Sequence, residues 1–151
     1  MSQPWTTLFS LNRQVLMERN LADLTQSQAD QPPAPHVNSV TWILTHLVEN
    51  RRWLLATVLR SGERAPAAGP RTLAQLRAAM DDMQAALAEA FDAVVDWNEP
   101  RIHPAMQISA PLDQIAGTFL MEEAYHLGQL GTARKLLGLP GAIKAPETAK
   151  V

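Results

Sequence analysis

Apolar side chains recur at intervals of three and four residues between Pro70 and Pro100. The repeating positions are Leu73, Leu76, Met80, Met83, Leu87, Phe91 and Val94. This spacing places the apolar side chains on one face of an α-helix, which we expect to pack against a core. Thr72 and Gln75 have the spacing of a capping box at its start. The pattern therefore predicts an amphipathic helix over residues 72–95.

Proline divides the rest of the chain in the same way. The proline-free segments cover residues 5–31, 36–65, 71–99 and 112–139. Because proline breaks a helix from within, each segment can hold one long helix. The predicted helices cover residues 5–28, 38–61, 72–95 and 111–137. The sequence thus predicts an all-α fold, a four-helix bundle formed by one domain over residues 1–140, with a C-terminal tail at 141–151.

The predicted helix ends carry suitable capping residues. Asn38 is the expected N-cap of the second helix, and Pro111 suits the first turn of the fourth. Gly138 and Pro140 then end the fourth helix. Strand signals are nearly absent from the sequence. His36 and His103 fall in the predicted connections, where we expect them to be solvated.

The fourth helix has ionisable residues among its apolar ones. On a helical wheel at about 100° per residue, one apolar stripe contains Leu112, Ile115, Phe119, Leu130, Ala133 and Leu137. Glu122 and His126 fall in the middle of this stripe and Gln129 beside them, whereas Glu123 falls off the stripe as an expected surface charge. A carboxylate in an apolar layer is unfavourable unless it is paired, protonated or bound to a metal.

The second helix supplies a partner for this pair. Its apolar stripe contains Val40, Ile43, Leu44, Leu47, Leu54, Leu55 and Val58. His46 lies off that stripe, among Trp42, Asn50 and Trp53. Together with Glu122 and His126 it would form a set of two imidazoles and one carboxylate. Three protein ligands with open positions are typical of a catalytic metal site.

Two other interpretations of the same residues remain open. Glu122 and His126 could form a buried pair with each other or with an arginine, in a non-catalytic bundle that dimerises or sequesters a ligand. The arginines considered are Arg19, Arg52 and Arg134. A di-iron bundle has less support, because that class repeats a Glu-x-x-His motif, and Glu123 with His126 is a single copy.

Two segments resemble the DinB/YfiT-like family of metalloenzymes. The first is NSVTWILTHL at residues 38–47, followed by RRWL at 51–54. The second is EEAYHLGQL at residues 122–130. Both motifs occur in the order and at the separation found in the family, and the resemblance extends from the second predicted helix to Pro140. It implies a four-helix bundle, often a homodimer.

The resemblance also implies a metal site and a class of chemistry. Family members hold a divalent metal ion, such as nickel or zinc, with three histidines that match His46 and positions 122 and 126. This chain has Glu122 at the second of these positions, which gives a two-His-one-carboxylate set. Relatives include thiol-dependent S-transferases. The expected function is thus a metal-dependent S-transferase or hydrolase that acts on a small electrophilic substrate, with Gln129, Asn50, Tyr125 and Trp42 around the metal ligands.

Composition limits the remaining possibilities. The chain has no cysteine, which excludes a disulfide framework and a cysteine-ligated zinc site. The thiol would therefore be a separate low-molecular-weight molecule. The net charge of −2, without a basic stripe, speaks against a nucleic-acid partner. The apolar runs are too short for a membrane span and the N-terminus lacks the pattern of a signal peptide, so we expect a cytoplasmic protein that does not bind membranes.

Overall fold

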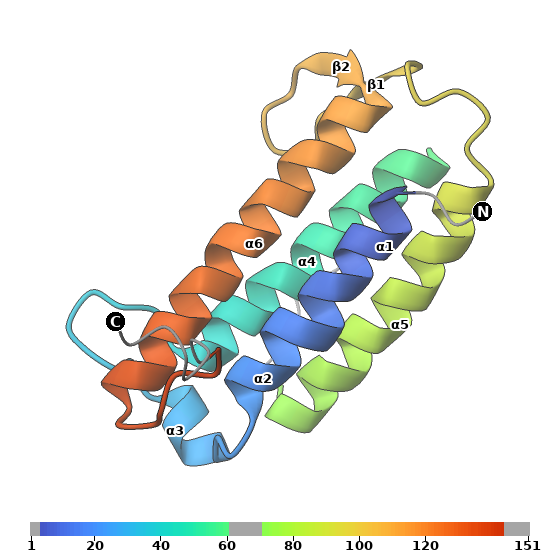
Figure 1. Cartoon of the computed structure of the whole chain (residues 1–151). Coiled ribbons are helices and arrows are strands. Elements are labelled where there is room, and N and C mark those ends of the chain that lie inside the picture. Colours follow the sequence, from blue (N-terminus) through green and yellow to red (C-terminus); the bar gives the residue numbers. More distant parts are fainter. Residues whose placement is uncertain (1–3, 61–70, 144–151) are drawn as a thin grey trace, which may run out of the picture.

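Long helices packed side by side form the body of the protein. The computed structural model describes residues 4–60 and 71–143, and it confirms the predicted all-α four-helix bundle (Figure 1). The helices are α1 (Pro4–Leu11), the π-helix η1 (Asn12–Met17), α2 (Glu18–Leu21), α3 (Gln26–Asp30), α4 (Val40–Leu59), α5 (Leu73–Asp92) and α6 (Leu112–Leu136). The first three run on from one another as a single rod. The predicted helix end at residue 61 and most of the predicted tail lie outside the described residues.

The first rod is shorter than predicted. The expected helix over residues 5–28 is wrong, because the rod ends at Leu21 and a separate short helix, α3, follows. Ala22 has an extended ψ of 135° and Asp23 a left-handed φ of 61°, conformations that a helix cannot contain. Thr25 then caps α3 through a capping box with Gln28. The capping box at Thr25 starts a new helix, so the helical segment is interrupted although no proline lies between α2 and α3.

The other helices begin and end within a few residues of the predicted positions. Ser39, and not Asn38, is the N-cap of α4, since its side chain accepts a hydrogen bond from the Trp42 N–H. The predicted capping box of Thr72 and Gln75 is confirmed at the start of α5. Pro111 lies one residue before α6, as its N-cap. Beyond the other end of α6, Gly138 has a φ of +82°, which glycine adopts without strain.

A small hairpin precedes α6, where no strand was predicted. Strands β1 (Pro100–Ile102) and β2 (Ser109–Pro111) pair antiparallel. The loop between them closes on His103, whose N–H donates to the Ile108 carbonyl while its own carbonyl accepts from the Gln107 N–H. The hairpin lies at the N-terminal end of α6, at one end of the bundle (Figure 1).

The core consists of two apolar clusters with a polar layer between them. One cluster includes Met17, Leu44, Leu76 and Leu130, and the other includes Phe9, Leu54, Phe91 and Phe119. At the level between them Arg51 of α4 pairs with Glu123 of α6, and these side chains are only 1% and 2% exposed. The expectation that Glu123 is a surface charge is therefore wrong. Its partner on another helix makes its burial possible.

Candidate metal centre

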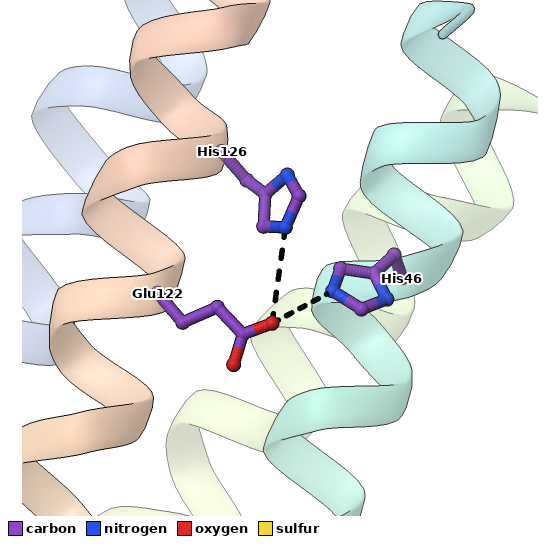
Figure 2. A group of neighbouring side chains, drawn as sticks. All are labelled: His46, Glu122 and His126. Carbon is purple, nitrogen blue, oxygen red and sulfur yellow. Dashed lines mark hydrogen bonds and ion pairs between the residues drawn. The ribbon is translucent and has the colours of Figure 1, made fainter.

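Three predicted ligands meet between α4 and α6. His46 extends from α4, while Glu122 and His126 are one turn apart on α6. Figure 2 shows the three side chains pointing toward one another across the space between the two helices. Helices α4 and α6 thus bring together residues that are far apart in the sequence.

The ligand atoms of the three side chains form a compact group. Glu122 Oε1 is 3.2 Å from His46 Nε2 and 3.8 Å from His126 Nε2. One ligand atom from each residue can be chosen so that all lie within 4.8 Å of one another. Two ligands of a tetrahedral zinc ion lie about 3.4 Å apart, as bond lengths near 2.1 Å require. Small side-chain movements would therefore bring this group to the size of a metal site.

A hydrogen bond to Gln129 sets the tautomer of His126. Its Nδ1 is 2.8 Å from Gln129 Oε1, the amide oxygen, which can only accept. Nδ1 therefore carries the proton, and in the neutral ring the lone pair is left on Nε2, the nitrogen that faces Glu122. Metal-binding histidines commonly have their other nitrogen bonded in this way. The predicted place of Gln129 beside the ligands agrees with this contact.

His46 is held by two further predicted neighbours. Its ring stacks on Trp42, with ring centroids 5.3 Å apart and an interplanar angle of 10°. Its Nε2 also lies 3.1 Å from Asn50 Nδ2. Nε2 thus lies between a donor, the Asn50 amide N–H group, and an acceptor, Glu122 Oε1, and its single lone pair or proton can serve only one of them.

The cluster is open to solvent on one side. The side chains of His46, Glu122 and His126 are 26%, 38% and 11% exposed. The prediction that Glu122 lies in the middle of a buried stripe is therefore wrong, because it lies at the edge of that stripe. Among the predicted arginine partners, Arg134 instead donates to the backbone carbonyls of Asn20, Ala22 and Pro140. An edge position leaves room for an exchangeable ligand.

A cavity adjoins the cluster. It has a volume of about 580 Å³ and is lined on α6 by Ala124, Tyr125, Gly128 and Gln129, and on the opposite side by Val37 and Ile43. Gln129 bonds to His126, and the Tyr125 ring stands nearly perpendicular to the His126 ring at 5.4 Å. Gln129 and Tyr125 therefore line the cavity and also contact His126, so the cavity lies next to the cluster.

A sequence comparison identifies the family. A model of the DinB superfamily matches residues 8–130. The chain belongs to the DinB superfamily. No curated protein matches the chain. As a DinB-superfamily protein it has glutamate at position 122, where the resemblance implied a histidine, and the structure places that carboxylate where the second histidine was expected.

A further residue of the DinB bundle, His103, differs from the expectation based on the sequence. His103 was expected to be solvated, but it is only 3% exposed and stacks on Phe119 at 5.2 Å. Burial lowers the pKa of the His103 imidazole below its usual value, and the nearby Glu122 carboxylate partly offsets this by raising the pKa. No periodic pattern in the hairpin indicated its burial. His36, in contrast, is exposed as predicted.

None of the helices in residues 4–60 and 71–143 combines the length and the apolar character needed to cross a lipid bilayer.

Proposed function

We propose that this protein is a divalent-metal-dependent enzyme whose metal is held by His46, Glu122 and His126. The observation that carries the proposal is the convergence of these three groups at the open edge of the bundle. The donor set fits zinc or nickel, since both accept imidazole and carboxylate ligands. The single carboxylate leaves excess positive charge on a divalent ion, which favours an anionic ligand at the open positions.

The proposed reaction is the attack of an activated thiol or water on a small electrophile. A divalent ion at this position would lower the pKa of a thiol or water molecule bound beside the protein ligands. Because the chain has no cysteine, the thiol would come from a low-molecular-weight compound. The two reaction types, S-transfer and hydrolysis, differ only in which nucleophile enters.

The residues around the ligands have separate roles in this proposal. Gln129 holds the His126 ring in the tautomer that ligation requires. Trp42 restricts rotation of the His46 ring by stacking on it. Tyr125 is 64% exposed at the edge of the cavity, where it would contact the apolar body of the substrate. Asn50, next to His46, would orient a polar group of the substrate or the Glu122 carboxylate.

Elemental analysis of the full chain, purified without a histidine tag, tests the metal site. We expect close to one equivalent of zinc or nickel per chain after reconstitution, together with a rise in melting temperature, because ligands that bind only the folded state stabilise it. His46→Ala should abolish uptake. His36→Ala is the matched control, since His36 lies outside the cluster, and it should retain it. Absence of metal in the reconstituted wild-type protein would refute the proposal.

A second function has one observation in its favour. The 3.2 Å contact between His46 and Glu122 could itself be the final state of the site, an ion pair in a non-catalytic, ligand-sequestering bundle. The Glu122→Leu variant separates the two functions. If the variant stays folded and loses metal uptake, the carboxylate is a ligand; if wild type and variant both bind none, the non-catalytic function is favoured.

The resemblance also leads us to propose a homodimer in the cytoplasm. Sedimentation equilibrium of the full chain tests the dimer directly.

A further inference from the structure

One imidazole nitrogen near the cluster is buried without a hydrogen-bond partner. His103 is 3% exposed, and within the described residues its Nε2 makes no hydrogen bond. A buried polar atom without a partner is unfavourable, and such atoms are rare in folded proteins. His103 Nε2 therefore needs a hydrogen-bond partner. This partner is either a group of the chain that reaches it only when a ligand is bound, or a water molecule.

The hairpin decides which hydrogen-bonding role this nitrogen has. The other ring nitrogen, Nδ1, accepts hydrogen bonds from the N–H groups of Ala105 and Met106, at 3.3 and 3.2 Å. Nδ1 therefore keeps its lone pair, and Nε2 must carry the proton of the neutral ring. An Nε2–H group cannot ligate a metal ion, so His103 is a donor and not a fourth ligand.

The location of the ring shows which acceptor lies nearby. His103 stacks on Phe119 with an interplanar angle of 7°, and Phe119 is one turn before Glu122 on α6. In Figure 2 one Glu122 oxygen faces both imidazoles, while the other points away from His126, toward the N-terminal end of α6. Both contacts to the histidines use Oε1, so Oε2 is left free of them, and the Glu122 carboxylate is close enough to His103 to raise the pKa of its imidazole.

We propose that His103 is a positioning residue of the metal centre, and that its Nε2–H donates to Oε2 of Glu122, directly or through one water. The inference rests on the proposed function and extends it to a residue outside the family motifs. With Oε2 held from the hairpin side, Oε1 stays directed at His46 and His126. Carboxylate ligands generally need such an outer hydrogen bond to keep their orientation. The hairpin thereby contributes a residue to the metal site.

Two substitutions separate this role from the structural role of the ring. In His103→Asn the side-chain amide lies near the former Nδ1, so it can still accept from the loop but cannot reach Glu122. In His103→Gln the amide lies near the former Nε2 and can still donate. Both variants remove the stacking on Phe119, so each controls for the other. The test uses full-length, tag-free protein and Zn²⁺ as the probe, with affinity measured by chelator competition.

We expect His103→Asn to lower the Zn²⁺ affinity by about 10-fold or more, the usual effect of losing an outer-shell hydrogen bond. His103→Gln should stay within about 3-fold of wild type. In a Glu122→Ala background, His103→Asn should cause no further loss, because the two changes act on one interaction. Equal affinities of wild type and His103→Asn, or an equal loss in both backgrounds, would overturn the inference.

A metal-free measurement tests the inference separately. Long-range ¹⁵N–¹H correlation spectra of the apo protein report the tautomer of each histidine, and we expect His103 in the Nε2–H form. The Nδ1–H form would overturn the inference even if the protein binds zinc. Wild-type protein that takes up no zinc would instead overturn the proposed function, and the inference with it. A zinc-binding wild type with an unaffected His103→Asn variant refutes the inference alone.

Discussion

Glu122 and Glu123 are adjacent in the sequence but lie in opposite surroundings. Glu123 is 2% exposed and accepts two hydrogen bonds from Arg51, at 2.7 and 2.8 Å. Glu122 is 38% exposed and contacts two histidines through one oxygen. Successive residues are about 100° apart around a helix, so one carboxylate faces the polar layer and the other faces the edge between α4 and α6. Glu123 therefore has its hydrogen-bonding needs met by Arg51, whereas Glu122 still has capacity to bind a ligand.

The hydrogen-bond partners of the Arg51–Glu123 pair all come from the chain itself. The Arg51 guanidinium donates to Glu123, to Gln84 of α5 and to the Phe9 carbonyl of α1. One side chain ties four helical segments together, and at 1% exposure it is out of reach of a ligand in solution. The Glu122 cluster has two imidazoles and an amide around it, in place of a guanidinium with its permanent charge. We therefore assign stability to the first site and ligand binding to the second.

The largest expected effect is on the buried pair. Arg51→Met would leave the Glu123 carboxylate buried without its partner, and we expect unfolding free energy to fall by about 3–5 kcal/mol. Urea denaturation of the metal-free protein measures this. Glu122→Gln is the matched control, and it should change stability by less than about 1 kcal/mol because its ion pair is partly exposed. Similar losses in both variants would show that the two carboxylates contribute equally to stability.

The next largest expected effect is on metal affinity, and here the important carboxylate is that of Glu122. Glu122→Gln should weaken Zn²⁺ binding by more than about 100-fold, since loss of a ligand exceeds the 10- to 100-fold loss typical of outer-shell changes. Isothermal titration of tag-free protein measures the affinity. Glu99→Gln, a substitution of another partly exposed glutamate outside the cluster, serves as control. Unchanged binding by the Glu122 variant would contradict the assignment of its carboxylate as a ligand.

A smaller effect is expected at Gln129. Replacement by alanine removes the acceptor that fixes the His126 tautomer, and the Zn²⁺ affinity should fall by about 10- to 100-fold. Gln114→Ala, at an exposed position on the same helix, controls for the loss of a glutamine from α6. If both variants bind zinc as tightly as the wild type, the Gln129 contact does not prepare the ligand.

The smallest effect is the pH dependence due to His103. Burial lowers the pKa of His103 in the folded state below its usual value, so the folded protein binds this proton less readily than the unfolded chain. The resulting stabilisation is present above the unfolded pKa and is lost as pH falls toward the lowered folded pKa. Urea midpoints of metal-free wild type and His103→Asn at pH 7.5 and 5.5 test this. The wild type should lose more stability on acidification, and equal losses would contradict the shift.

Much of the helical architecture follows from short-range patterns in the sequence. Proline positions predict the four long segments, and the Thr72–Gln75 capping box begins α5 as expected, because both signals act within one turn of the backbone. The break after Leu21 escaped this reasoning, since a left-handed Asp23 leaves no strong trace in a single sequence. Helix ends depend on a few residues whose competing capping options are nearly equal, as Asn38 and Ser39 illustrate.

Part of the candidate site could also be predicted from local sequence motifs. The motifs indicated His46, Glu122 and His126, and the structure brings them together. The wheel misplaced the two glutamates because it was built from apolar residues alone. Whether a charged residue belongs to the core depends on its partner, and Arg51 is 72 residues away from Glu123.

The sequence by itself therefore determined the class of fold, the approximate helices and the three residues of the candidate metal site, since these depend on periodicity, proline and local motifs. Only the tertiary structure decided which glutamate is buried and that His103 of the hairpin is buried against Phe119. These features arise from contacts between separate helices and a loop. Their energies depend on distance and burial in three dimensions, which no spacing along the chain encodes.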